Sequence, residues 1–127
     1  MLPDEPNLSV LKALPPVTSC NGYSWKAGQS KQVVFLTGDG HIHELYVILG
    51  EPWRHADLTA MTGAPPTPGG TLGATQDMNG YSWEAGRSKQ VVFAGNDGHI
   101  YELWVALGGE WHSADLTAIS GAPTWLS

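Results

Sequence analysis

One segment of the chain occurs twice in the sequence. Residues 21–65 read NGYSWKAGQSKQVVFLTGDGHIHELYVILGEPWRHADLTAMTGAP, and residues 79–123 read NGYSWEAGRSKQVVFAGNDGHIYELWVALGGEWHSADLTAISGAP. The second copy starts 58 residues after the first, needs no gap to align, and is identical at 31 of the 45 positions. A repeat unit of this length cannot bury its own apolar faces, so neighbouring units must cover them. The repeat therefore predicts an array of similar structural units.

The rest of the chain is interpreted around these two units. Residues 7–16 align with residues 57–66 through a leucine and two prolines, so the chain opens with the tail of a unit. The Pro/Gly-rich stretch between the two complete units predicts a loop rather than a boundary between independent domains. The predicted organisation is an N-terminal segment with a partial unit (1–20), a first unit (21–66), a connector (67–78), a second unit (79–123) and a C-terminal tail (124–127).

Each unit shows the two-residue period of β-strands. The run Gln32–Phe35 is rich in β-branched and aromatic residues, and Asp39-Gly40 is a strong hairpin signal. With one strand before this run and two after it, a unit holds about four short antiparallel strands, which is typical of a propeller blade. The last strand is expected over Trp53–Ala60. A short helix over 56–62 with Asp57 as its cap is the alternative, and it is not preferred because the segment is short and rich in threonine.

Composition and charge exclude several classes of function. The 127 residues carry a formal net charge of −6, and their six Lys and Arg residues are scattered rather than clustered. Nucleic-acid binding needs a basic face, so no nucleic-acid partner is expected. The longest apolar stretch, around 45–49, is too short to span a membrane, and the first six residues lack the features of a signal peptide. We therefore expect a soluble chain without membrane insertion, either cytoplasmic or secreted by a leaderless route.

Metal and catalytic chemistry find little support in the sequence. The single cysteine, Cys20, forms neither an intrachain disulfide nor a CxxC site. His41 and His43 lie two residues apart on one strand, but the second unit offers His99 and Tyr101 instead, and no third ligand is evident. No Ser-His-Asp or Cys-His order is present. We therefore expect no metal, no cofactor and no enzymatic activity.

The strings GYSW, KQVVF, DGHIHELY or DGHIYELW, ADLTA and GAP resemble the blades of tandem-repeat β-propeller lectins of bacteria and fungi, which include the fucose-binding lectins. The resemblance covers residues 7–123. It implies that a sugar lies between adjacent blades, held by polar groups and stacked on an aromatic ring. It also implies that Glu44 and Glu102 are the sugar-binding glutamates. The family's partner arginine, twelve residues earlier, is replaced here by Gln32 and Gln90.

The residues themselves also favour a sugar site. A sugar needs polar groups for its hydroxyls and an apolar platform for its C–H face, and each unit offers a glutamate, a glutamine and two aromatic rings. Alternatively, the tryptophans pack between blades and the glutamates accept bonds from a neighbouring backbone; Trp25 and Trp83 are expected to be such packing residues. The candidate sugar-binding residues are Gln32, Glu44, Tyr46, Trp53, Gln90, Glu102, Trp104 and Trp111.

The predicted fold is all-β, with two four-stranded β-propeller blades per chain and a ring completed by homo-oligomerisation. Three copies would give six blades, the ring size that the resemblance implies; a dimer and a tetramer are the alternatives. The predicted function is that of a carbohydrate-binding lectin that presents several sites to glycans, with fucose or related neutral sugars as ligands. The alternative is a scaffold for oligomerisation or protein interaction in which the same residues only pack.

Overall fold

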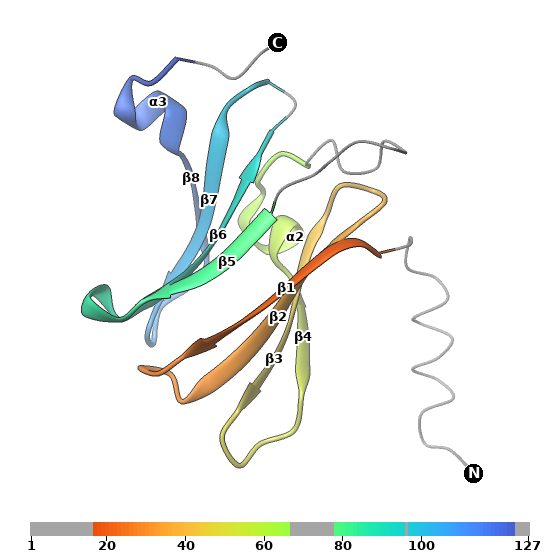
Figure 1. The fold of residues 1–127 in the computed structure, drawn as a ribbon, viewed down its shortest axis with the longest axis vertical. Coiled ribbons are helices and arrows are strands. Elements are labelled where there is room, and N and C mark those ends of the chain that lie inside the picture. The colour runs from red at the N-terminus through yellow and green to blue at the C-terminus, as the bar shows by residue number, and fades with distance from the viewer. Residues whose placement is uncertain (1–16, 67–77, 96, 124–127) are drawn as a thin grey trace.

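The described residues form two antiparallel sheets of four strands each (Figure 1). The computed structural model describes residues 17–66, 78–95 and 97–123, so the predicted partial unit at residues 7–16, most of the connector and the C-terminal tail lie outside them. The first sheet consists of β1 (Val17–Trp25), β2 (Ser30–Thr37), β3 (Ile42–Ile48) and β4 (Arg54–Asp57). The second consists of β5 (Met78–Trp83), β6 (Ser88–Ala94), β7 (Ile100–Ala106) and β8 (His112–Asp115). The all-β prediction with four strands per unit is confirmed.

The repeat is reproduced in the pairing of the strands. Val34 lies opposite Glu44 in the first sheet, and Val92 lies opposite Glu102 in the second. The predicted hairpin between the second and third strands of each unit is also present. Gly40 and Gly98 have φ of 84° and 80°, the left-handed region that a glycine adopts without steric strain.

Each unit ends in a short helix, which corrects one expectation. The strand predicted over Trp53–Ala60 stops at Asp57, and α2 (Leu58–Thr62) follows; α3 (Leu116–Ser120) is its counterpart. The physical reason is capping: Oδ1 of Asp57 accepts a hydrogen bond from the Ala60 amide at 3.0 Å. The threonines assist, since the Ile42 amide donates to Oγ1 of Thr59 at 2.8 Å and so ties the helix to β3. The alternative considered for this segment, a short helix capped by Asp57, is therefore the one observed.

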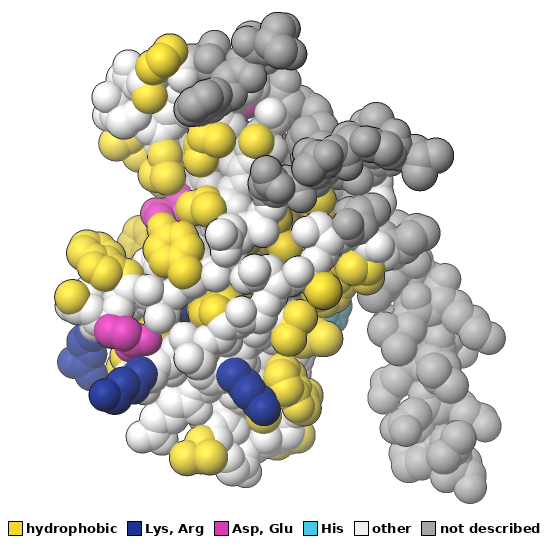
Figure 2. All heavy atoms as spheres, viewed as in Figure 1, with side chains coloured by type: hydrophobic (Ala, Val, Ile, Leu, Met, Phe, Trp, Pro, Cys, Tyr) yellow, Lys and Arg dark blue, Asp and Glu magenta, His cyan; other side chains and the backbone are white. Residues whose placement is uncertain are grey.

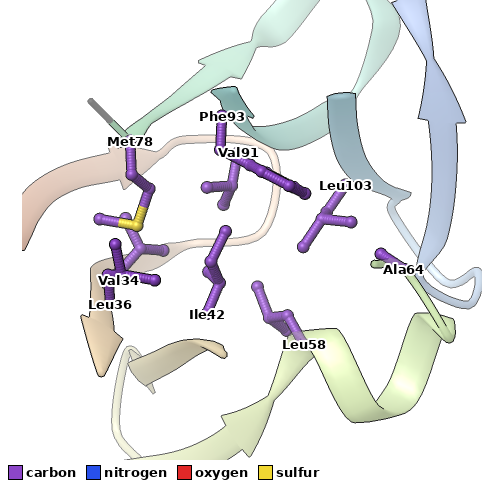
Figure 3. Close-up of a cluster of buried hydrophobic side chains, with 9 residues drawn as sticks. All are labelled: Val34, Leu36, Ile42, Leu58, Ala64, Met78, Val91, Phe93 and Leu103. Carbon is purple, nitrogen blue, oxygen red and sulfur yellow. The ribbon is translucent and has the colours of Figure 1, made fainter. Parts of the chain in front are cut away.

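One face of each sheet packs against the other sheet. Figure 3 shows side chains from both sheets pointing toward one another in a shared core. The core also includes Leu58 from α2 and Ala64 just beyond it, so α2 and the turn after it help to close the core. Neither unit covers this surface alone, in agreement with the prediction from the repeat. The buried core residues are Val34, Leu36, Ile42, Leu58, Ala64, Met78, Val91, Phe93 and Leu103.

The first strands of the two units, β1 and β5, approach each other closely. A Cβ atom at Gly80 would lie 2.6 Å from Cε1 of Tyr23, so only glycine fits there without movement. At one end of the junction, the Glu84 carboxylate accepts hydrogen bonds from the amides of Lys26 and Ala27, both at 3.0 Å. Glu84 belongs to a 3-10 turn, η2 (Glu84–Gly86), that follows β5. These contacts fix how the second sheet lies on the first.

The second face of each sheet has no covering sheet among the described residues. Large apolar side chains are exposed on the two halves of the molecule, including Leu45, Trp53 and Trp83. Figure 2 shows hydrophobic side chains gathered in patches on one side of the molecule, with a few charged side chains beside them. Within the described ranges, no helix is long and apolar enough to cross a membrane.

Candidate functional site

The two sides of strand β3 have different surroundings. Glu44 and Tyr46 are two residues apart and therefore share the side that faces the second sheet. Glu44 is almost fully buried there, with 1% of its surface exposed. Leu45 lies between them in the sequence and is exposed on the opposite side. Strand alternation thus places a carboxylate and an aromatic ring together at the junction of the two units.

A lysine of the second unit pairs with this carboxylate. Lys89 on β6 reaches across the junction, and its Nζ lies 3.0 Å from Oε1 and 3.2 Å from Oε2 of Glu44. Both side chains are buried. A buried charge is tolerated when it is paired and hydrogen-bonded, so each of these two groups depends on the other.

Three aromatic rings surround the lysine. The Nζ of Lys89 lies 5.2 Å from the ring centres of Trp25 and Tyr46, and 5.4 Å from that of Trp111. These distances are within the range of cation–π attraction. Two of the rings come from the first unit and one from the second. The charge pair therefore lies inside an aromatic cage that both units build.

Burial changes the proton affinities of the groups in this cage. It raises the pKa of the Glu44 carboxyl and lowers the pKa of the Lys89 ammonium, while the attraction between the two opposes both shifts. Burial, and then the negative charge of Glu44, raise the pKa of the Tyr23 hydroxyl. Tyr23 therefore stays protonated beside the carboxylate. The site holds one positive and one negative charge and is neutral as a whole.

A pocket of about 310 Å³ opens beside the charge pair. Glu44, Lys89 and Tyr46 line it from the sheets, and the β7–β8 turn at Leu107–Gly109 forms its rim. Trp25 also lines it, and the buried indole N–H of Trp25 has no acceptor among the described residues. The volume is at the small end of ligand pockets. The arrangement offers a carboxylate and an ammonium for polar groups of a ligand and ring faces for its apolar surface.

Not all predicted residues of the first unit join this pocket. Trp53 is 52% exposed and does not line it; its ring lies under the Nζ of Lys31 at 5.7 Å. Gln32 is buried beside Tyr46 in the strand register, and its Nε2 donates to Oγ of Ser30 at 2.5 Å. The ring that completes the pocket is instead Trp111 of the second unit.

The other predicted residues of the second unit, Gln90, Glu102 and Trp104, lie on the face of the second sheet that points away from the first sheet, which we call its open face. The hydroxyl of Tyr81 donates to Oε2 of Glu102 at 3.5 Å, and burial raises the pKa of that carboxyl. Trp104 stacks on the ring of His112 with centroids 4.6 Å apart. Gln90 is buried and bonds to its neighbour Ser88. Within the described part of the chain, no cation lies within ion-pair distance of Glu102.

Two residues of the pocket were missed as candidates. Lys89 was not predicted because the resemblance implies a basic partner twelve residues before the glutamate, at the positions of Gln32 and Gln90. A signal was present, since Lys31 and Lys89 mark the one place in the repeat where both units carry a lysine or an arginine. Trp25 was expected to be a packing residue; it is buried, and it also lines the pocket. Trp83, expected to behave in the same way, is 62% exposed.

One group of side chains has the composition of a metal site. Asp97, His99 and Asp115 bring ligand atoms within 4.8 Å of one another. Each of these groups already has a structural partner: Nδ1 of His99 lies 2.6 Å from Oδ2 of Asp115, and Oδ1 of Asp97 accepts from the His99 amide at 3.0 Å. The group is therefore explained by the connection between the hairpin and the helix cap. In the first unit, His41 bonds to Asp57 in the same way.

Comparison with solved structures finds a match to the BP39L lectin from Burkholderia pseudomallei. The TM-score is 0.56 at 17% sequence identity, and the match covers 77% of this chain. The aligned part is 26% of that lectin's chain. No protein-family model and no curated protein sequence matches the chain. At this identity the likeness shows a shared fold.

Proposed function

We propose that this protein is a carbohydrate-binding lectin whose site lies between its two repeat units. The observation that carries the proposal is the Glu44–Lys89 pair, which is held inside a pocket walled by aromatic rings. Sugar sites combine polar groups for hydroxyls with a ring for the C–H face, and this pocket has both. The structural likeness to a bacterial lectin supports the same class of function.

The chemistry of the pocket favours a neutral sugar. The carboxylate of Glu44 accepts hydrogen bonds from hydroxyl groups, and the ammonium of Lys89 donates to a hydroxyl or ring oxygen. Because these charges balance, a charged sugar would leave an uncompensated charge in a buried site. Neutral sugars are therefore the expected ligands, and the resemblance to fucose-binding lectins makes fucose the first of them to test.

The two sheets are proposed to be blades of a β-propeller that several copies of the chain complete. A ring gives each sheet a neighbour on both faces, which would cover the exposed apolar side chains. Three copies would form six blades and repeat the site around a rigid ring. Such repetition raises the avidity for multivalent glycans well above the affinity of a single site.

A packing scaffold is the second candidate, and one observation favours it. The Lys89 ammonium already occupies the centre of the aromatic cage and already pairs with Glu44. If the pair serves only to fix the junction, the protein assembles without binding sugar.

Isothermal calorimetry separates the two candidates. Wild-type protein is titrated with fucose, with other neutral monosaccharides and with multivalent glycans, beside Tyr46→Ala and Trp111→Ala. Loss of a ring that covers the sugar is expected to weaken binding at least about tenfold. Arg54→Ala is the matched control, because Arg54 is exposed, pairs with Glu51 and does not line the pocket.

Circular dichroism verifies that each variant is folded. Absence of heat with the wild type across the whole panel would leave the scaffold as the function. Equal affinities for wild type and both ring variants would place the sugar site elsewhere.

A further inference from the structure

The two open faces of the molecule carry the two halves of the site described above. A shift of 58 residues converts Glu44 and Tyr46 into Glu102 and Trp104, which lie on the open face of the second unit. The same shift converts Lys89 into Lys31, which lies on the open face of the first unit. The internal junction thus shows how these two halves would fit together.

Each half is already arranged as in the closed site. Lys31 holds its Nζ 5.7 Å from the ring centre of Trp53, as Lys89 does at 5.4 Å from Trp111. On the other half, Tyr81 donates to Glu102, in the place that Tyr23 takes beside Glu44. The half-sites therefore need little rearrangement to meet.

The charges of the two halves are unmatched within one chain. Among the residues that the structure describes, no carboxylate lies within ion-pair distance of Lys31 and no cation within that distance of Glu102. At the internal junction, the equivalent groups form an ion pair, with Nζ of Lys89 3.0 Å from Oε1 of Glu44. One open face thus offers a cation and the other offers the carboxylate that it lacks.

The two open faces also carry apolar side chains that correspond to those packed together at the internal junction. Val34 and Val91 face each other across the internal junction and are fully buried in the core. Their counterparts, Val92 and Val33, are only partly buried on the open faces. A hollow of about 730 Å³ beside Lys31 and Trp53 leaves room on this face of the first unit.

We propose that the open face of the second unit docks on the open face of the first unit of another copy, and that Lys31 of that copy pairs with Glu102. The second copy thereby supplies Lys31 and Trp53 to a second pocket around Trp104, which is incomplete in one chain. The contact is head-to-tail, so repeating it gives a closed ring when the rotation between copies divides a full turn, and an open filament otherwise. This inference rests on the proposed function for the ligand of the second pocket, but the contact itself does not depend on sugar binding.

Charge reversal tests the contact. Lys31→Glu and Glu102→Lys each place like charges together at the junction, and each is expected to weaken assembly at least about tenfold in sedimentation equilibrium. The double variant Lys31→Glu/Glu102→Lys restores an opposite pair and is expected to recover the wild-type mass. A wild-type monomer at micromolar concentration, or single variants that assemble as the wild type does, would overturn the proposal.

Sugar stoichiometry distinguishes failure of this contact from failure of the proposed function. In calorimetry with the best neutral monosaccharide, the wild type is expected to bind two sugars per chain. Each single variant is expected to bind one, because the Glu44–Lys89 pocket lies within the chain. If the charge-reversal variants change the assembly mass as expected but no sugar binds to any of the proteins, the contact between copies is supported and the lectin function is wrong. If sugar binds at two sites in a monomeric variant, the shared pocket is wrong.

Discussion

Glu44 and Glu102 occupy the same place in the repeat and have different surroundings. Glu44 is 1% exposed and pairs with Lys89 at 3.0 Å, whereas Glu102 is partly buried and bonds only weakly to Tyr81 at 3.5 Å. Burial raises the pKa of both carboxyls, but only that of Glu44 has a cation to oppose the shift. The strand fixes the position of the glutamate, and the residues of the neighbouring unit determine its burial and whether a cation pairs with it.

The two junctions would not be identical even in a closed ring. Glu84 accepts two backbone hydrogen bonds across the internal junction, and its counterpart in the first unit is Lys26. A contact between copies therefore lacks this carboxylate. The junction between copies is expected to be weaker than the internal one, so that assembly can be disrupted by substitutions that leave the chain folded.

The largest expected difference lies between the two lysines of the repeat. Lys89→Ala leaves the Glu44 carboxylate buried without its partner, which is expected to cost about 3–5 kcal/mol of unfolding free energy. Lys31→Ala removes an exposed side chain and is expected to change the stability of the single chain by no more than about 0.5 kcal/mol. Urea denaturation at low protein concentration measures both.

A rescue sharpens this comparison. The double variant Glu44→Leu/Lys89→Met replaces the pair by apolar side chains of similar size and is expected to recover most of the lost stability. Equal losses for Lys89→Ala and Lys31→Ala in the dilute chain would show that the internal pair contributes no more than an exposed residue.

Much of the fold could be predicted because the repeat aligns without gaps. Period-two patterns and the Asp-Gly turns were sufficient for the strands, since these signals are local. A strand was preferred to the capped helix in these segments because the stability of α2 and α3 comes from an aspartate cap and also from a threonine bonded to the neighbouring strand, β3 for α2 and β7 for α3. That second contact links residues 17 apart and has no signature in local composition.

The candidate site could be predicted only in part. Alternation along one strand was enough to place Glu44 beside Tyr46. It could not show that Lys89 and Trp111 come from the other unit, because the way in which one sheet packs on the other is a tertiary property. Trp53 was grouped with Glu44 for the same reason: residues close in the sequence were assumed to share one site.

A pair of glycines gives the second test. Gly80 approaches Tyr23 so closely that an added Cβ would lie 2.6 Å from the ring, and Gly80→Ala is expected to cost about 1–3 kcal/mol by overpacking. The equivalent Gly22 has only the carbonyl oxygen of Gln32 at 3.6 Å. Gly22→Ala is therefore expected to leave the stability of the chain nearly unchanged and to prevent assembly, since Gly22 would face Tyr81 of a second copy.

Thermal melting and sedimentation velocity report the two effects separately. Intact assembly of Gly22→Ala would mean that the copies meet elsewhere, and an unchanged melting temperature of Gly80→Ala would mean that β1 and β5 separate easily.

The smallest expected effect concerns a histidine that the second unit lacks. His43 is buried, stacks between Phe35 and His55, and has its Nδ1 3.0 Å from Nε2 of His55. Burial lowers its pKa from the ordinary value of 6.5, and the charges of the neighbouring aspartates only partly oppose this. Tyr101 takes its place in the second sheet, where it stacks on Phe93. The two units therefore differ in how they respond to acid.

The sign of the response follows from where His43 binds a proton. In the unfolded chain, His43 takes up a proton as the pH falls through about 6.5. In the folded chain, the His43 imidazole stays neutral down to a lower pH. The free energy of unfolding therefore falls as the pH falls across that interval. Asp39 and Asp57 have lowered pKa values and stay ionised in that pH interval. The hydrogen bond to Asp115 raises the pKa of His99, so His99 contributes to the pH dependence with the opposite sign.

The variant His43→Tyr, which copies the second unit, keeps these other groups and removes only the histidine. Melting curves between pH 8 and about pH 5.5 should show a steeper loss of stability for the wild type than for this variant. Parallel curves would mean that His43 has the same pKa in both states and that the buried stack has no effect on its titration.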